Sequence, residues 1–284
     1  MEARQKMSTI DTLYQLRQWQ PAYRSDAIIE EGILLPNTVM MLFGAAGTWK
    51  TMNAIHLAFC LARGEPWFGF KTTQATVFSH QVELPKLIVR DRVTKYANGS
   101  RVASQNLFFE TPEDDLLLDT TFGLQQLTRD IEEVKRRATS PSLPLVVILD
   151  PLYLYLAGHI SDEYEVKKFQ QNVNLLRRKH DITFVIIHHS RLRRIDSSGQ
   201  VVDLGAEEIM GSSYWNNWLD TIVRVQLTNP FTGSDTVHVS FGKARNSQVF
   251  LPGFTVRWHR ENLVPEITER DLVLEDEPTV RNLT

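Results

Sequence analysis

Cysteine is nearly absent from this chain of 284 residues, since Cys60 is the only one. A single thiol excludes an intrachain disulfide and a zinc cluster built from cysteines. It also makes a reducing cytoplasm the natural setting. Because Cys60 lies within an apolar pattern, we expect it to pack in the core.

Long apolar runs are missing as well. The N-terminal stretch MEARQKMSTIDTLYQLRQ has no apolar core of the kind that a secretory signal needs. No run approaches the roughly eighteen apolar residues of a membrane span. We therefore expect a cytoplasmic protein with no membrane partner.

The chain has no excess of positive charge, with 31 basic and 34 acidic residues and a net charge of −3. No global field draws it to nucleic acid, so any such contact must come from local clusters. The remaining composition, 42% apolar and 23% charged, is typical of a soluble globular protein. The length fits one large α/β domain with a short arm or tail.

Apolar runs alternate with helical patterns along the chain. The runs PNTVMMLFG, ATVFSHQVEL, LPLVVILDP and ITFVIIHHS predict buried strands. Helices are predicted over residues 10–24, 51–63, 85–97, 122–138 and 164–180. This order is typical of an α/β fold with a mostly parallel sheet and helices on both faces. TIVRVQL, TVHVSFGK and FTVRWH predict short antiparallel strands at the C-terminal edge of the sheet.

The stretch FGAAGTWKT joins the first strand to a helix and has the character of a phosphate-binding loop. Lys50 would reach the β- and γ-phosphates and Thr51 would bind Mg²⁺, while the helix N-terminus favours negative charge. A glycine turn before a core helix gives the same pattern. The candidate loop comprises Gly44, Ala45, Ala46, Gly47, Thr48, Trp49, Lys50 and Thr51.

Trp49 departs from the usual fingerprint, which has a glycine before the lysine. Either the backbone keeps a negative φ at this residue or the loop is strained.

Two carboxylates follow predicted strands. Asp150 ends LVVILD, at the sheet edge where nucleotides bind, and would hold a water of the Mg²⁺ shell. Glu83 ends the neighbouring strand and can orient a water for attack on the γ-phosphate. A turn or cap aspartate and a solvated glutamate are the alternatives.

Two histidines, His188 and His189, end the strand ITFVIIHH at the same edge. One could donate a hydrogen bond to the γ-phosphate and sense hydrolysis. A structural role is the alternative for each.

The order of motifs resembles RecA-like hexameric ATPases of the plasmid RepA and DnaB replicative-helicase kind. It covers roughly residues 28–258 and comprises GAAGTWKT, ARGEPWFGF, QVELP, VVILDP, VIIHHSR, GSSYWNNWLD and FGKARN. The resemblance implies that Lys50 and Thr51 bind ATP or another NTP with Mg²⁺. It also implies Glu83 as the catalytic carboxylate, Asp150 as the second acidic motif and a strand-end histidine as sensor.

Two further features depend mainly on this resemblance. Lys243 and Arg245 match the Lys-x-Arg finger that such proteins extend into the neighbouring subunit's nucleotide; a solvated basic hairpin is the alternative. YLYLAGHISDEY and RLRRIDSSGQVVDLG correspond to loops that line the channel of the ring. The second loop could grip the phosphates of single-stranded DNA. Its basic residues are Arg191, Arg193 and Arg194.

The resemblance thus implies a ring, expected to be a hexamer, that moves along single-stranded DNA in replication of a plasmid, phage or mobile element. A primase or initiator protein is an implied partner. Residues 1–27 would form an arm that contacts a neighbouring subunit, residues 28–265 the ATPase domain and residues 266–284 an acidic tail. About forty residues precede the loop, which suits the short RepA type. A DNA-binding or regulatory ATPase without unwinding, and a P-loop small-molecule kinase, are the alternatives.

Overall fold

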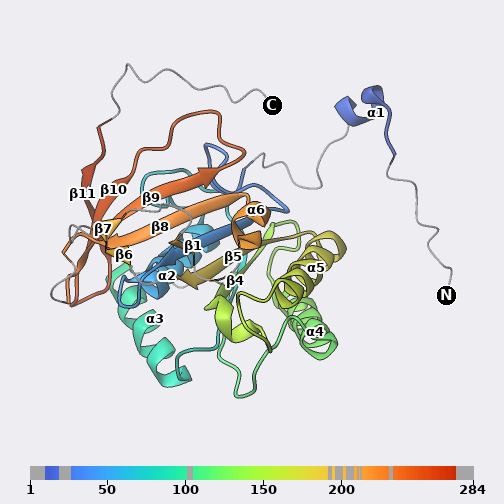
Figure 1. Ribbon diagram of the computed structural model, residues 1–284, viewed down its shortest axis with the longest axis horizontal. Helices are drawn as coiled ribbons and strands as arrows, with labels where there is room; N and C mark the ends of the chain where they lie inside the picture. The colour runs from blue at the N-terminus through green and yellow to red at the C-terminus, as the bar shows by residue number, and fades with distance from the viewer. Residues whose placement is uncertain are drawn as a thin grey trace.

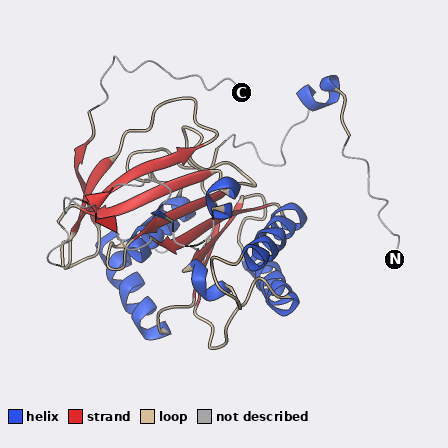
Figure 2. Ribbon diagram, viewed as in Figure 1, coloured by secondary structure: helices blue, strands red, loops and turns tan. Residues whose placement is uncertain are grey.

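A nine-stranded sheet with helices on both faces forms the centre of the molecule (Figures 1 and 2). The computed structural model describes residues 10–18, 27–100, 105–190, 194–195, 201–202, 208–209, 211, 213–229 and 233–272. The helices are α1 (Leu13–Gln18), α2 (Lys50–Arg63), α3 (Lys86–Ser100), α4 (Thr121–Arg137), the 3-10 helix η1 (Leu152–Tyr155), α5 (Glu163–His180) and α6 (Tyr214–Trp218). The strands are β1 (Val39–Gly44), β2 (Thr76–Gln81), β3 (Leu107–Glu110), β4 (Leu145–Asp150), β5 (Ile182–His189), β6 (Arg194–Ile195), β7 (Val201–Val202), β8 (Thr221–Leu227), β9 (Thr236–Ala244), β10 (Phe254–Trp258) and β11 (Pro265–Arg270).

The strand order is β11-β10-β9-β8-β1-β5-β4-β2-β3. Strands β8, β1, β5, β4, β2 and β3 are parallel, and β9, β10 and β11 add an antiparallel extension. The predicted α/β class is confirmed. The predicted antiparallel pairing of TIVRVQL is seen between β8 and β9, and β8 in addition pairs parallel with β1. Its two partners run in opposite directions, and a single strand's sequence does not encode that.

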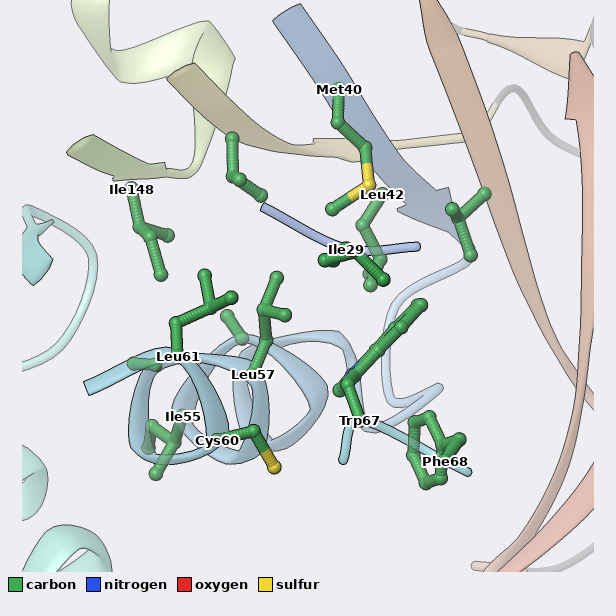
Figure 3. Close-up of a cluster of buried hydrophobic side chains, with 14 of the residues drawn as sticks. Ile29, Met40, Leu42, Ile55, Leu57, Cys60, Leu61, Trp67, Phe68 and Ile148 are labelled. Carbon is green, nitrogen blue, oxygen red and sulfur yellow. The ribbon is translucent and has the colours of Figure 1, made fainter. Parts of the chain in front are cut away.

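Helix α2 packs against one face of the sheet (Figure 3). Leu57 and Leu61 lie one turn apart, so both face the strands. The helix ends at Gly64, whose φ of 68° is a left-handed conformation that glycine adopts readily. Side chains drawn in this cluster include Ile29, Met40, Leu42, Ile55, Leu57, Cys60, Leu61, Trp67, Phe68 and Ile148, and Cys60 is buried as predicted. The helix that follows the loop is therefore anchored in the core.

The opposite face is covered by α4 and α5. Met41 and Phe43 of β1 point to this side, whereas Met40 and Leu42 point to α2. Alternation of this kind explains why the central strands read as continuous apolar runs. Both faces of β1 are therefore packed in the core, and the loop after Gly44 begins at the end of this buried strand.

Three predicted boundaries change. Strand β2 ends at Gln81, so Glu83 lies in the following turn rather than at the strand end. The predicted helix over residues 10–24 is seen as α1, and residues 19–26 lie outside the described residues. The stretch predicted as an acidic tail begins with β11, because Ile267 packs against the core cluster and gives the strand an inner face. Edge strand β3 was not predicted.

Among the described residues, no helix is both long enough and apolar enough to cross a bilayer.

Candidate active site

A cleft of about 460 Å³ lies at the carboxyl ends of the parallel strands, over the start of α2. Its walls come from the loop after β1, the turn after β2, the ends of β4 and β5, and the turn between β10 and β11. The lining residues are Ala46, Gly47, Thr48, Trp49, Lys50, Thr51, Met52, Glu83, Leu84, Arg92, Asp150, His189 and Leu263. The cleft therefore brings together the loop, both acidic candidates and one histidine.

Lys50 is buried at the start of α2, and its Nζ donates to the carbonyl oxygen of Ala45 at 2.5 Å. Burial lowers the pKa of Lys50 to about 8, while Asp150 and Glu83 act in the opposite direction. The first backbone N–H groups of a helix have no partner within the helix, and the Trp49 side chain makes no capping bond to them. Phosphate oxygens suit these donors and the ammonium group.

Trp49 adopts the left-handed conformation that the fingerprint assigns to glycine, with φ 63° and ψ 19°. Of the two alternatives for this residue, the strained backbone is the one observed. For a residue with a Cβ this conformation costs roughly 1–2 kcal/mol. Contacts elsewhere must offset that cost, and the Trp49 side chain is partly buried against the core cluster.

Asp150 is buried, with 3% of its surface exposed. It accepts hydrogen bonds from Thr51 and from Nε2 of Gln81, the latter at 2.9 Å. Burial raises the pKa of Asp150 to about 6, and the hydrogen bond from Thr51 opposes this shift. A buried carboxylate beside a hydroxyl offers the hard oxygen donors that Mg²⁺ prefers, so these two residues fit the metal.

No group of three or more histidine, cysteine or acidic side chains that could hold a metal exists within the described ranges. A Mg²⁺ ion would therefore depend on oxygens from substrate and water, as it does in nucleotide sites.

Glu83 lies in the turn between β2 and α3, with an exposed side chain that lines the cleft. Its backbone N–H donates to Oε1 of Gln81 at 2.7 Å, and that of Leu84 donates to the same oxygen at 3.3 Å. Gln81 thus joins the turn of Glu83 to the carboxylate of Asp150.

Sequence reasoning missed Gln81 and Arg92. The signal for Gln81 is register, since it pairs with Asp150 in the parallel β2–β4 ladder. Arg92 lies on α3 and lines the cleft, where its charge lowers the pKa of Asp150. A partner on a neighbouring helix has no mark in a single sequence.

The two histidines separate to opposite faces of the sheet. His189 lines the cleft, and its ring lies 5.4 Å from that of Tyr153. Burial, and then the Lys50 ammonium, lower the pKa of His189, so it is neutral at pH 7. His188 is fully buried beside Phe43, on the side of α4 and α5. Only His189 stands where a nucleotide sensor would be.

Lys243 and Arg245 lie at the opposite end of the parallel strands from the cleft. Ala244 pairs with Thr221, which pairs with Met40, so the pair sits at the amino end of β1. Nζ of Lys243 donates to the Asn216 carbonyl at 2.7 Å. The guanidinium of Arg245 contacts Asp220 at 3.4 Å and the Asn217 carbonyl at 3.0 Å. Neither side chain lines the cleft of its own chain.

The predicted basic loop is described only in part. Arg191 and Arg193 lie outside the described residues, and the backbone of Arg194 pairs with Val202 in the β6–β7 ladder. The N–H of Ser190 donates to the carbonyl of Gly44 at 3.0 Å. The loop therefore leaves the sheet beside the end of β1.

Comparison with known proteins supports this picture. The AAA domain family matches residues 4–194, and the chain belongs to that family. A comparison with curated protein sequences finds no match.

Many solved structures share the fold, among them the following three. A DnaB-like replicative helicase, described with its interactions with primase, has a TM-score of 0.60 at 13% identity, over 80% of this chain and 58% of that one. A second structure, that of an ATPase domain, has a TM-score of 0.61 at 12% identity, covering 85% and 92%. The RadB recombinase has a TM-score of 0.50 at 14% identity, covering 80% and 90%. The chain spans 58% of the length of the helicase. The predicted resemblance is confirmed: the chain belongs to the AAA domain family, and its fold is the RecA-like one that it shares with a DnaB-like replicative helicase.

Proposed function

We propose that the protein hydrolyses ATP, or another NTP, and that it forms a ring, expected to be a hexamer, which moves along single-stranded DNA and separates duplexes. The observation that carries this proposal is that the candidate residues form two separate groups in one chain. The candidate phosphate loop and both carboxylates meet in one cleft, at the carboxyl ends of the parallel strands. Lys243 and Arg245 lie at the other end of these strands. A second copy of this chain can bring its Lys243 and Arg245 to the cleft of the first copy.

In the cleft, Lys50 and the first-turn N–H groups of α2 hold the phosphates. Thr51 and Asp150 would hold Mg²⁺, which neutralises phosphate charge when bound. Glu83 orients a water and accepts its proton, since its exposed carboxylate lines the cleft. His189 reports the state of the γ-phosphate through a hydrogen bond.

Across a subunit interface, Arg245 stabilises charge on the neighbour's γ-phosphate, and Lys243 supports it. Arg245 is exposed, and its present partners belong to α6 and Asp220 of its own chain. The arm of residues 1–27 docks on a neighbouring subunit through α1. Every residue of α1 is exposed, including the apolar Leu13 and Leu16.

Single-stranded DNA binds to the loop that carries Arg191, Arg193 and Arg194. Its backbone link from Ser190 to Gly44 supports the proposal, because movement of the P-loop strand and of the loop would then be joined. By likeness to the helicase described with primase, a primase or initiator protein is the proposed partner, in replication of a plasmid, phage or mobile element.

Strand displacement on a forked duplex, measured with ATP and with dTTP, tests the proposal. We expect NTP-dependent unwinding by the unmodified protein and none by Lys50→Ala. DNA-stimulated hydrolysis without unwinding would favour a regulatory or DNA-binding ATPase. Phosphate transfer to a small molecule, with no effect of DNA, would favour a kinase.

A further inference from the structure

Trp49 is held in its left-handed conformation by residues from the C-terminal part of the chain. Its Nε1 donates to the carbonyl oxygen of Ser234 at 2.9 Å. Its ring stacks on that of Trp258, with centroids 5.6 Å apart and planes within 1°. The guanidinium of Arg260 lies 5.9 Å from the centre of the Trp49 ring. We call Ser234, Trp258 and Arg260 the Trp49 brace.

The brace is itself anchored. Trp258 is fully buried on β10, and its ring meets that of His56 on α2 edge-on at 6.3 Å. Arg260 donates to the Gly233 carbonyl and accepts a bond from Lys95 on α3 through its own carbonyl. The segment that holds Trp49 is therefore attached to both helices that flank the cleft.

The turn between β10 and β11, which carries Arg260, also reaches the cleft directly. Between β10 and β11, Leu263 has a φ of 58° and lines the cleft beside Trp49. A ligand that fills the cleft would touch the turn as well as the loop. The turn and the loop therefore line the same cleft, and a change in the conformation of one would affect the other.

Trp49 stands directly before Lys50, at the N-cap of α2. Its φ and ψ set the direction in which the first-turn N–H groups point. A residue that prefers another conformation keeps this one only while tertiary contacts hold it. Loss of the brace would therefore let the loop relax away from the geometry that a phosphate needs.

We propose that Arg260 and Trp258 are positioning residues that act through Trp49, so that the turn between β10 and β11 sets the affinity of the loop for nucleotide. This inference rests on the proposed nucleotide-binding function. In a chain with glycine at this position, the backbone would need no such support. The brace therefore takes over a role that glycine has in the usual fingerprint.

A double-mutant cycle tests the inference, with Mg²⁺-ATP as the probe and calorimetric titration as the measurement. Arg260→Ala should raise Kd and KM by roughly two- to fivefold, the worth of an exposed cation–π contact, with kcat unchanged. Arg260→Lys should restore most of the affinity. Arg257→Ala, which removes an exposed arginine of β10 that does not contact Trp49, should leave Kd unchanged.

In a Trp49→Gly background, Arg260→Ala should have no further effect on Kd. An equal effect in both backgrounds, or none with Trp49 present, would overturn the inference. If the unmodified protein does not bind ATP, or Lys50→Ala binds it equally well, the proposed function itself fails.

Discussion

At the scale of single residues, the two glycines of the loop serve different purposes. A Cβ on Gly44 would lie 2.2 Å from the carbonyl oxygen of Val225, so the close approach of β8 requires glycine. Gly47 has open space around it, but its φ is 76°. One glycine is therefore required by packing and the other by backbone conformation.

This difference predicts unequal effects of alanine. Gly44→Ala should displace β8 and cost at least 1–3 kcal/mol, as overpacking does. Gly47→Ala should cost about 1 kcal/mol and leave the sheet unchanged. Denaturant unfolding of the two variants checks this, and an equal loss in both would contradict the packing argument.

Asp150 has a raised pKa, which makes stability depend on pH. Its pKa rises from 3.8 to about 6 on folding, so the folded protein holds the proton more tightly. Ionisation of this buried carboxyl lowers the free energy of unfolding. The loss is absent below pH 3.8, the unfolded pKa, grows as the pH rises to the folded pKa of about 6, and is complete above it. By linkage the shift corresponds to up to about 3 kcal/mol.

We therefore expect Asp150→Asn to be more stable than the unmodified protein above about pH 6, and equal to it near pH 3.8. The same change should abolish Mg²⁺-dependent hydrolysis. Unfolding curves across this pH range, together with an ATPase assay, test the pair of outcomes. A stability difference that does not change with pH would show that Asp150 ionises normally.

At the scale of elements, the base of the basic loop is closed by buried charges. Arg224 of β8 and Glu208 lie 2.5 Å apart, with exposed fractions of 6% and 8%. Ser190 and Ile209 form a bridge beside them. Both ends of the loop are thus attached to the sheet next to β1.

Removing one member of such a pair leaves a buried charge without its counter-ion. Glu208→Ala should cost on the order of 3–5 kcal/mol. A paired Glu208→Leu and Arg224→Met change should recover most of that loss, because apolar residues of similar volume need no counter-ion. Thermal unfolding measures both, and no recovery in the double variant would argue against the electrostatic cause.

Elements also differ in how readily the sequence predicts them. Strands β1, β4 and β5 are buried along nearly their whole length, so their apolar runs are plain in the sequence. Edge strand β3 is half-buried throughout and was missed. Strand β11 carries charged residues on its exposed side and was taken for a tail. The period of a strand is visible only when burial imposes it.

At the scale of the whole molecule, the separation of the cleft from Lys243 and Arg245 predicts complementation. Arg245→Ala protomers keep an intact phosphate loop, and Lys50→Ala protomers keep an intact finger. If the protein forms the proposed ring, mixtures of the two variants should contain some interfaces with both an intact Lys50 and an intact Arg245, and partial ATPase activity should return. Fingers of this kind contribute about 10³ to 10⁵ in rate, so the recovery should be easily measured.

The control is each variant alone, which should be inactive yet assemble and exchange subunits. If the mixture stays inactive at every ratio, and dilution leaves the specific activity of the unmodified protein constant, the finger does not act between subunits. The kinase alternative would then gain support.

The sequence by itself determined the α/β class, the candidate phosphate loop and the two carboxylates that the structure places beside it in the cleft. These are local signals: an apolar run, a glycine spacing and an acidic residue after a strand. Only the tertiary structure decided which histidine faces the cleft, that Gln81 joins Asp150 to the turn of Glu83, and how Trp49 is held. The bond from Trp49 to Ser234 spans 185 residues, and a contact at that separation exists only once the sheet has brought the C-terminal strands beside β1.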